Sequence, residues 1–356
     1  MKNLSNLQTE IINNEDHVIF VEAAAASGKT AIIVEKIKKE LSANKGSVVA
    51  FTFTNAAAEE MYERVGQVDN ANLFIGTIHS YCVRLLLSHG IDKALKYCED
   101  QRFDELFKLV KSNLDCIKPV YCLICDEMQD CNSEQFEFIF EMINTQKYFC
   151  CYDRRQSIYR WNGAHPEYIS EYINRLNATV LSLDENYRNA TSILIYAKNI
   201  IMTAGYDYRD TSKPMRGISG KVIPDLEYNP QAIARTFANM KDGFGEWFIL
   251  TRTNAQIDEI ANALKRYGVP FDTFKRAQLD NKELNKKMKE NTVKVLTIHT
   301  AKGLEANNVI VIGAKFYNLE ERCISYVAAT RARNQLIWTK MPYRQKPAFS
   351  TTNWEN

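Results

Sequence analysis

Short apolar runs alternate along the chain with longer segments in which apolar residues recur every three or four positions. Short runs rich in Val, Ile and Phe are typical of buried strands, and the longer pattern is typical of amphipathic helices. The expected strands are Val18–Val21, Val48–Phe53, Leu73–Ile78, Cys122–Cys125, Tyr148–Tyr152, Trp247–Thr251, Val293–Ile298, Val309–Gly313 and Gln335–Thr339. The expected helices are Ala31–Leu41, a segment from Thr54, Tyr81–Ser88, one or two between Ile91 and Pro119, Ala255–Arg266 and Glu320–Ala332. Strands that alternate with helices predict an α/β fold with a parallel, doubly wound sheet.

The remaining segments are polar or rich in turn residues. Turn-forming residues are concentrated between Tyr206 and Gln231, and Asp280–Asn291 has the charge of a solvated helix or loop. With 356 residues, 46% hydrophobic and 25% charged, the chain has the length and composition of two ordinary globular domains. No apolar run is long enough to cross a membrane and the N-terminus lacks a signal-peptide core, so we expect a cytoplasmic protein without membrane contacts.

The net charge and the cysteines bear on three possibilities, namely binding of nucleic acid, a disulfide framework and a metal site. The net charge of +2 is nearly neutral, so any binding of nucleic acid depends on local geometry. Nine cysteines, an odd number, are typical of reduced thiols rather than a disulfide framework. Cys122 and Cys125 have a spacing that metal ligands also use, with Cys116 and Cys131 nearby. We favour a buried strand for YCLICDE, because residues three apart on a strand point to opposite faces.

The most informative segment is Val18–Ile33, VIFVEAAAASGKTAII, in which a strand, a loop of small residues and a helix follow one another. Backbone N–H groups of such a loop surround phosphate oxygens, and the helix dipole favours their charge. In this pattern Lys29 reaches the outer phosphates and the Thr30 hydroxyl holds Mg²⁺. Ala23 and Ala26 occupy positions where glycine is common, although alanine adopts positive φ only at a cost. The loop residues expected around the phosphates are Ala25, Ala26, Ser27 and Gly28. An ordinary strand–turn–helix is the alternative.

Two carboxylates, Asp126 and Glu127, follow the apolar strand at Cys122–Cys125. Ligands of doubly wound sheets bind at the carboxyl ends of the strands. Asp126 is therefore placed to orient the shell of a Mg²⁺ ion, and Glu127 to polarise an attacking water. A solvated strand end is the alternative. The phosphate-binding loop (P-loop) between Ala23 and Thr30, upstream in the chain, favours the catalytic interpretation.

Two further features suit a nucleotide or a nucleic acid. Aromatic residues and arginines are interleaved in Asp153–Ala164, DRRQSIYRWNGA, as suits stacking on bases beside phosphate contacts. Core packing is the alternative for Tyr159 and Trp161. The amide of Gln8, ahead of the first strand, has the donors and the acceptor that an adenine edge requires, with a solvated helix as the alternative.

The chain resembles the UvrD/Rep family of superfamily 1 helicases in motifs that follow the family's order, namely FTFTNAAAEEM, GTIHSYCVRLL, CDEMQD, DRRQSIYRWNGA, LDENYRNATSIL, TIHTAKGLE and EERCISYVAATRA. The resemblance extends from Leu4 to about Leu336. It implies two RecA-like P-loop NTPase domains with parallel sheets, ATP in the cleft between them and single-stranded DNA across both. We expect an N-terminal RecA-like ATP-binding domain at 1–185, a C-terminal RecA-like helicase domain at 186–341 and a disordered tail at 342–356.

The resemblance also implies roles for matching residues. Gln8 and Tyr187 are expected at the adenine and Glu305 at the ribose, beside the P-loop residues through Lys29 and Thr30. The residues expected to drive hydrolysis are the metal ligand Asp126, the base Glu127, the γ-phosphate sensor Gln156, and Arg188 and Arg331 from the second half. The residues expected to contact DNA are Phe53, Thr54, Asn55, Thr77, His79, Tyr159, Trp161, Thr297 and His299. Capping or core contacts are the alternative for the threonines and histidines.

The chain also departs from the family. Asn162 follows Trp161 where family members often carry arginine, and Ala306 follows Glu305 where an aromatic residue is usual. The large insertion in each half is reduced, to about 91–119 and about 276–292, which leaves a nearly bare motor better suited to translocation than to duplex separation. We expect no nuclease domain after the helicase motifs.

We therefore expect an enzyme, an ATP hydrolase that uses ATP and Mg²⁺ to move 3′–5′ along single-stranded DNA and acts as a translocase or helicase. Its substrates would be single strands or single/double-strand junctions, in DNA repair or antiviral defence. The alternative is a regulatory ATP- and DNA-sensing subunit that controls a protein partner such as a nuclease. A generic P-loop kinase or GTPase would not need the paired aromatic and threonine motifs.

Overall fold

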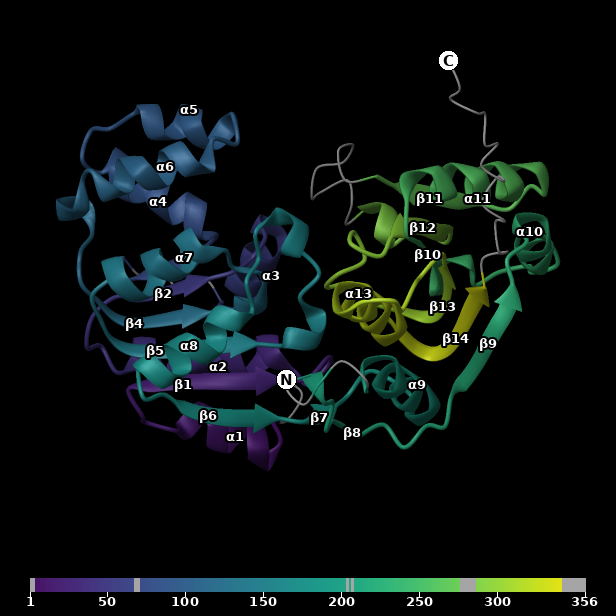
Figure 1. The fold of residues 1–356 in the computed structure, drawn as a ribbon, viewed down its shortest axis with the longest axis horizontal. Helices are drawn as coiled ribbons and strands as arrows, with labels where there is room; N and C mark the ends of the chain where they lie inside the picture. Colours follow the sequence, from purple (N-terminus) through teal and green to yellow (C-terminus); the bar gives the residue numbers. More distant parts are fainter. Residues whose placement is uncertain (1–3, 67–70, 203–204, 206–207, 276–285, 341–356) are drawn as a thin grey trace, which may run out of the picture. The chain divides into compact units, whose positions relative to one another are not determined.

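The chain folds into two compact units, each built on a parallel sheet as predicted (Figure 1). The computed structural model describes residues 4–66, 71–202, 205, 208–275 and 286–340. Unit 1 comprises residues up to Asn189, Lys198–Gly217 and Tyr317–Tyr326, and unit 2 comprises Ala190–Ala197, Ile218–Phe316 and residues from Val327 onward. The expected tail at 342–356 and much of the charged segment Asp280–Asn291 lie outside the described residues.

The sheet of unit 1 has the strand order β3-β2-β4-β5-β1-β6, with neighbouring strands parallel. Its strands are β1 (Val18–Ala23), β2 (Val48–Phe51), β3 (Leu73–Gly76), β4 (Val120–Cys125), β5 (Thr145–Tyr152) and β6 (Thr179–Leu183). Its helices include α1 (Asn6–Asn13), α2 (Lys29–Ser42), α3 (Asn55–Val65), α4 (Ile78–Leu87), α5 (Lys93–Glu99), α6 (Phe103–Lys111), α7 (Ser133–Glu137) and α8 (Glu167–Arg175). The short strands β7 (Glu185–Asn186) and β8 (Lys213–Pro214) pair with each other.

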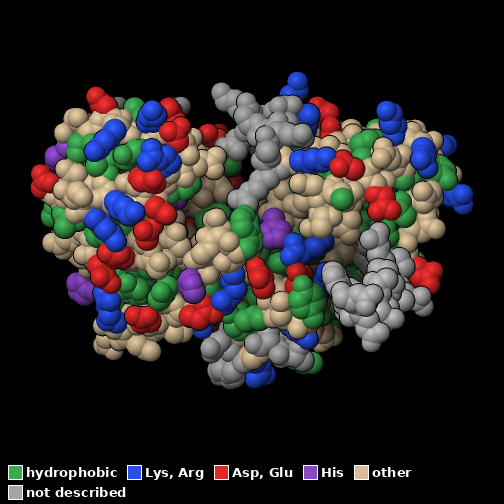
Figure 2. Space-filling model, turned by 45° about the horizontal axis from the view of Figure 1, so that its top comes forward, with side chains coloured by type: hydrophobic (Ala, Val, Ile, Leu, Met, Phe, Trp, Pro, Cys, Tyr) green, Lys and Arg blue, Asp and Glu red, His purple; other side chains and the backbone are tan. Residues whose placement is uncertain are grey.

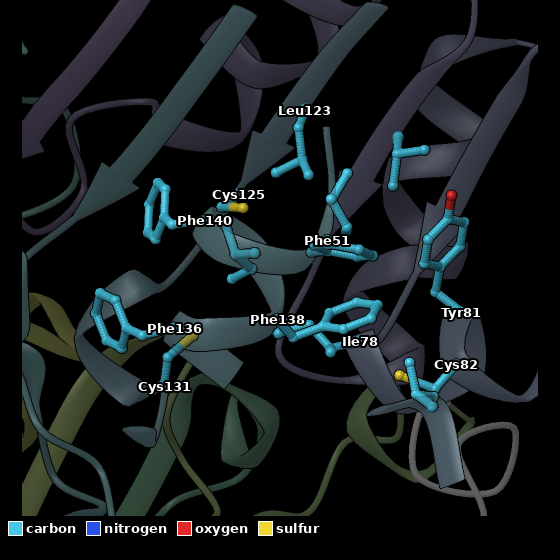
Figure 3. Close-up of a cluster of buried hydrophobic side chains, with 14 of the residues drawn as sticks. Phe51, Ile78, Tyr81, Cys82, Leu123, Cys125, Cys131, Phe136, Phe138 and Phe140 are labelled. Atoms are coloured by element: carbon cyan, nitrogen blue, oxygen red, sulfur yellow. The ribbon is translucent and has the colours of Figure 1, made fainter. Parts of the chain in front are cut away.

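Apolar side chains cover both faces of this sheet. On one face, aromatic rings from the sheet and its covering helices form a continuous core (Figure 3). The ring centroid of Phe51 on β2 lies 6.3 Å from that of Phe138 and 5.4 Å from that of Tyr81. Cys125 belongs to this core, whereas Cys122 belongs to the core on the opposite face, with apolar residues of α1, α2 and α3. Both cysteines are buried in one strand and point to opposite faces, so the strand interpretation of YCLICDE is confirmed.

The sheet of unit 2 has the order β11-β12-β10-β13-β14-β9, again with parallel neighbours. Its strands are β9 (Lys221–Glu227), β10 (Trp247–Thr251), β11 (Phe271–Phe274), β12 (Val293–Thr297), β13 (Ala306–Ile312) and β14 (Ala332–Lys340). The helices α10 (Pro230–Ala238) and α11 (Asn254–Arg266) join a core with the sheet through Phe237 and Ile257. The helices α9 (Thr191–Ile201) and α13 (Leu319–Thr330) each contribute residues to both units.

Two predicted strands are wrong at their carboxyl ends. β2 ends at Phe51 rather than Phe53, and β3 ends at Gly76 rather than Ile78. The physical reason is helix capping, because the hydroxyls of Thr54 and Thr77 accept the N–H groups that open α3 and α4. An apolar residue that opens a helix, such as Ile78, looks like the end of a strand when only its polarity is considered.

Several elements escape the apolar pattern altogether. β9 lies within the stretch Tyr206–Gln231, where turn residues are concentrated, and most of its side chains are exposed. It is an edge strand that pairs with β14 and contains Pro224, as edge strands tolerate. Sequence reasoning assigned no element to α8, β6, α9, α10 or β11, which the structure forms.

The described part of the chain contains no helix that is both long and apolar enough to cross a membrane. Lys and Arg side chains are interspersed with Asp and Glu side chains on the visible face of the molecule (Figure 2). This mixture accords with the net charge of +2. Recognition of an anionic ligand must therefore come from particular residues.

Candidate nucleotide and DNA site

The loops that follow the parallel strands of unit 1 carry most of the candidate residues. The P-loop follows β1, Asp126 and Glu127 follow β4, and Asp153–Gln156 follows β5. β4, β5 and β1 are consecutive neighbours in the sheet, so their carboxyl ends lie side by side at one edge. This edge is where doubly wound sheets bind ligands.

The P-loop has the backbone of a phosphate-binding turn despite its missing glycines. Gly28 adopts φ +86° and is the N-cap of α2, and a Cβ there would lie 2.6 Å from Nε2 of Gln8. Ala26 adopts φ +61°, the left-handed conformation for which glycine is the usual residue. The Ser27 hydroxyl is buried and has no hydrogen-bond partner among the described residues, and a bound phosphate satisfies such a group. The loop therefore fits a nucleotide phosphate, with backbone strain stored at Ala26.

The Lys29 ammonium group lies between the two carboxylates at the end of β4. Its Nζ is 3.2 Å from Oδ1 of Asp126 and also pairs with Oε1 of Glu127. Burial alone would lower the pKa of Lys29, but the two carboxylates hold it above its ordinary value. Burial, together with the charge of Glu127, raises the pKa of Asp126 against the opposing effect of Lys29. The Asp126 carboxylate and the Thr30 hydroxyl are oxygen donors of the kind that Mg²⁺ prefers, so the residues present fit this ion.

A chain of hydrogen bonds leads from Glu127 to the loop after β5. Glu127 itself adopts φ +54° and accepts a hydrogen bond from Nε2 of Gln129. Gln129 is fully buried, and its Oε1 accepts the N–H of Asp153 at 2.9 Å. The Asp153 carboxylate in turn accepts a hydrogen bond of 2.8 Å from Nε2 of Gln156. The structure thus connects the expected base, Glu127, with the expected γ-phosphate sensor, Gln156.

The predicted adenine residues also reach the P-loop. Gln8 is buried rather than solvated, and its Nε2 donates to the Ser27 carbonyl at 3.0 Å. The Tyr187 N–H donates to the Ala26 carbonyl at 3.0 Å, and its hydroxyl donates to Glu185. The structure therefore brings Gln8 and Tyr187 to adjacent carbonyls of the P-loop. Their contact with adenine remains a prediction.

The remaining predicted nucleotide residues are Arg188 in unit 1 and Arg331 and Glu305 in unit 2. Arg188 belongs to unit 1, where its carbonyl accepts a hydrogen bond from Arg216. In unit 2, the Arg331 side chain is 2% exposed and donates to the carbonyls of Val327 and Leu304. Glu305 of unit 2 pairs with Arg333. The roles of Arg188, Arg331 and Glu305 in catalysis and ribose binding remain predictions.

Three aromatic rings of the predicted DNA set contact one another in a row in unit 1, in the order Phe53, Tyr159 and Trp161. The rings of Phe53 and Tyr159 are stacked, with centroids 4.9 Å apart and planes at 22°. Tyr159 contacts Trp161 edge to face at 6.3 Å. Tyr159 is buried, whereas Trp161 is 59% exposed. Tyr159 is thus packed against Phe53 and its contact with DNA remains a prediction, while the surface position of Trp161 leaves its indole accessible for stacking on a base.

The predicted threonines and histidines are placed mainly by local contacts. Thr54 and Thr77 cap helices, and the Thr297 hydroxyl accepts the N–H of Thr300 at 3.2 Å. The His79 ring is stacked on Phe103 of α6, with centroids 3.9 Å apart, and burial lowers the pKa of His79 to about 4. Of the remaining positions in the set, Asn55 opens α3 and His299 is half-buried after β12. DNA contact by these residues remains a prediction.

Sequence reasoning missed several residues that hold the site together. Gln129 and Asp153 form the link just described, and Nδ2 of the buried Asn186 donates to the Ala25 carbonyl at 3.0 Å. Phe103 comes from the reduced insertion and covers His79. Gln129, Asp153 and Asn186 each lie inside a motif that was recognised, so a polar residue within a buried motif was the available signal.

Taken together, the parallel sheets, the P-loop lysine and the paired carboxylates define a P-loop NTPase with two RecA-like domains. The sequence profile of the UvrD/REP helicase N-terminal domain matches residues 4–118 and 101–177, and that of the UvrD-like helicase C-terminal domain matches residues 272–343. The chain belongs to the UvrD/Rep family of DNA helicases, a family of ATP-dependent enzymes.

Three relatives show the extent of the similarity. A probable DNA helicase of Mycoplasma pneumoniae is 24% identical over 95% of this chain and 83% of the relative. DNA helicase II of Escherichia coli is 26% identical over 77% of this chain, which spans 52% of that protein. Gabija protein GajB of Bacillus cereus is 26% identical over 78% of this chain and 65% of the relative. The chain thus spans only about half the length of DNA helicase II.

Proposed function

We propose that the protein hydrolyses ATP with Mg²⁺ and uses the energy to move 3′–5′ along single-stranded DNA. The observation that carries this proposal is the hydrogen-bonded series Lys29–Glu127–Gln129–Asp153–Gln156 in unit 1. Phosphoryl transfer depends mainly on positioning and charge stabilisation, and this series fixes the groups that would do both. The polarity is carried over from the resemblance to the family.

The residues of unit 1 divide the chemistry among them. Asp126 and Thr30 would hold Mg²⁺, which neutralises phosphate charge when it is bound. Lys29 would exchange its carboxylate partners for phosphate oxygens, which frees Glu127 to orient and polarise a water molecule. Gln129 would keep the Glu127 carboxylate in place through this exchange, because its amide also contacts the backbone after β5.

The DNA contacts would centre on Trp161. Base–aromatic stacking contributes roughly 1–3 kcal/mol per base and tolerates any sequence, as a translocating motor requires. Tyr159, which is stacked on Phe53, would hold Trp161 in position through its edge-to-face contact with the indole. The substrate would be a single strand or a junction of single and double strands.

A displacement assay tests movement and polarity together. Oligonucleotides carry biotin–streptavidin at the 5′ end or at the 3′ end, and ATP-dependent release of streptavidin is followed. The proposal predicts faster release from the 5′ end, and release that requires Glu127, so that Glu127→Gln is inactive although it still binds ATP. Faster release from the 3′ end would contradict the polarity. ATP-dependent release by Glu127→Gln equal to wild type would contradict the assigned base.

A second candidate function is favoured by the similarity to GajB and by the alanines of the P-loop. In that case the chain would be an ATP- and DNA-sensing subunit that controls a partner such as a nuclease, in defence or repair. It would bind ATP and single-stranded DNA, and turnover would be absent until the partner is added. Turnover by the purified chain alone, stimulated by DNA, would favour the motor.

A further inference from the structure

A buried carboxylate, Asp210, joins the loop after β5 to helix α13 within unit 1. Its Oδ2 accepts a 2.7 Å hydrogen bond from the Tyr326 hydroxyl on α13, and its Oδ1 accepts the N–H of Ser212 at 2.8 Å. Nη1 of Arg155 lies 3.8 Å from Oδ1 and donates to the Arg209 carbonyl at 3.1 Å. We call Asp210, Arg155 and Tyr326 the Asp210 junction.

The junction is directly attached to the expected γ-phosphate sensor. Nε of Arg155 donates to Oδ1 of Asp153 at 2.5 Å, while Oδ2 of the same carboxylate accepts from Gln156. The Asp153 carboxylate therefore holds Arg155 with one oxygen and Gln156 with the other. Any movement of Gln156 toward or away from a phosphate must be accommodated by a group that also holds Arg155.

The other end of the junction lies five residues before the expected catalytic arginine in the chain. Tyr326 is the last residue of α13 that belongs to unit 1, and Val327 to Thr330 of the same helix belong to unit 2. Arg331 follows directly, and its guanidinium donates to the Val327 carbonyl. Because residues four apart share a helix face, Tyr326 and Thr330 lie on the same face of α13, and Arg331 is the next residue in the chain.

The composition of the junction favours a positioning role over a purely stabilising one. Asp210 and Tyr326 are both buried. Burial acts to raise the pKa of Asp210, but Arg155 and the hydrogen bonds from Ser212 and Tyr326 hold it below its ordinary range. Buried ion pairs stabilise a fold weakly compared with apolar residues of similar volume, whereas they specify one arrangement of the groups that form them. A buried network in which each oxygen has a partner makes the groups that form it more rigid.

We propose that Asp210 and Tyr326 are positioning residues that couple the Gln156 loop to α13, so that ATP turnover depends on the hydrogen bond between them. This inference rests on the proposed ATPase activity. It adds Asp210, which lies outside the quoted motifs, and Tyr326, which lies within EERCISYVAATRA, as residues whose side chains act through Arg155 and the helix rather than on ATP.

The test removes one hydroxyl. Tyr326→Phe keeps the ring and deletes the hydrogen bond to Asp210. Tyr172→Phe is the matched control, because the hydroxyl of the buried Tyr172 on α8 also donates to a carboxylate, Glu141, at 2.7 Å. ATP hydrolysis by the full chain is measured with saturating single-stranded DNA, together with the affinity for ATP and the thermal midpoint.

We expect Tyr326→Phe to lower the DNA-stimulated kcat by about tenfold, the effect of losing one hydrogen bond to a charged group in the transition state. Its KM for ATP should stay at the wild-type value, and Tyr172→Phe should keep the wild-type kcat. Asp210→Asn combined with Tyr326→Phe should lower kcat no further than Asp210→Asn alone, because residues that act as a unit are not additive.

If Tyr326→Phe has the wild-type kcat and DNA still stimulates the unmodified chain, the positioning role of Asp210 and Tyr326 is contradicted. The proposed function is not affected by that result. An equal loss of kcat in Tyr326→Phe and Tyr172→Phe would contradict the positioning role as well, since the effect would then be one of general packing. A wild-type chain that shows no DNA-stimulated hydrolysis would overturn the proposed function and the junction with it.

Discussion

The P-loop offers a sharp test of the backbone strain at Ala26. Alanine at φ +61° lies in the left-handed region, which costs an L-residue about 1–2 kcal/mol relative to glycine. Glycine in turn gives the unfolded chain more freedom, which lowers stability by about 0.4–1 kcal/mol. Ala26→Gly should therefore stabilise the fold by about 0.8 kcal/mol, within limits of roughly 0 and 1.6 kcal/mol, and raise the thermal midpoint by about 2–3 °C.

The neighbouring residue provides the control. Ala25 is buried and does not have positive φ, so Ala25→Gly removes a buried methyl group and gains no relief of strain. It should destabilise the fold by about 1–2 kcal/mol. Differential scanning calorimetry of both variants measures the two shifts under identical conditions. Opposite signs are expected, and a similar fall in the midpoint of both variants would refute the assignment of strain to Ala26.

Three further predictions concern stability and DNA binding. Lys36→Met removes the 3.0 Å ion pair of the buried Glu40, which keeps Lys147 at 3.4 Å from its other oxygen, and should lower the free energy of unfolding by about 1.5–3 kcal/mol, so a loss below about 0.5 kcal/mol in urea titrations would contradict this role. Trp161→Ala should weaken binding of a fluorescent single strand by roughly 1–3 kcal/mol, and unchanged affinity would remove Trp161 from the DNA contacts. The pKa of His79 is lowered to about 4, below its usual value near 6.5, so its contribution to stability is complete above pH 6.5 and is lost as the pH falls toward 4. His79→Gln should lose less stability than wild type between pH 7 and pH 5, and equal losses would show that another group is responsible.

The sequence predicted those parts of the fold that depend on local order. The P-loop, the apolar run before Asp126 and most strands of both sheets have patterns that short-range order specifies, whereas β6, β9 and β11 do not. Even the strain at Ala26 followed from the absence of a glycine at that position. Errors at the ends of β2 and β3 arose because Thr54 and Thr77 act through hydrogen bonds, which hydrophobicity does not record.

The rest depends on contacts between distant segments. Asp210 lies far along the chain from both Arg155 and Tyr326, and its own sequence surroundings are those of a polar turn. Phe103 covers His79 only because α6 packs on α4. A polar residue in such a segment looks solvated until the fold supplies its partner, so sequence patterns alone could not assign these roles.

The most direct measurement is the rate of ATP hydrolysis by the purified chain with and without single-stranded DNA, in the presence of Mg²⁺. A motor whose catalytic groups are held by the Lys29–Glu127–Gln129–Asp153–Gln156 series should hydrolyse ATP, and DNA should raise its rate severalfold. Glu127→Gln should abolish the stimulated rate while ATP still binds. If the wild-type chain binds both ATP and DNA and its rate stays at background with either, the assignment of a DNA-dependent motor is contradicted.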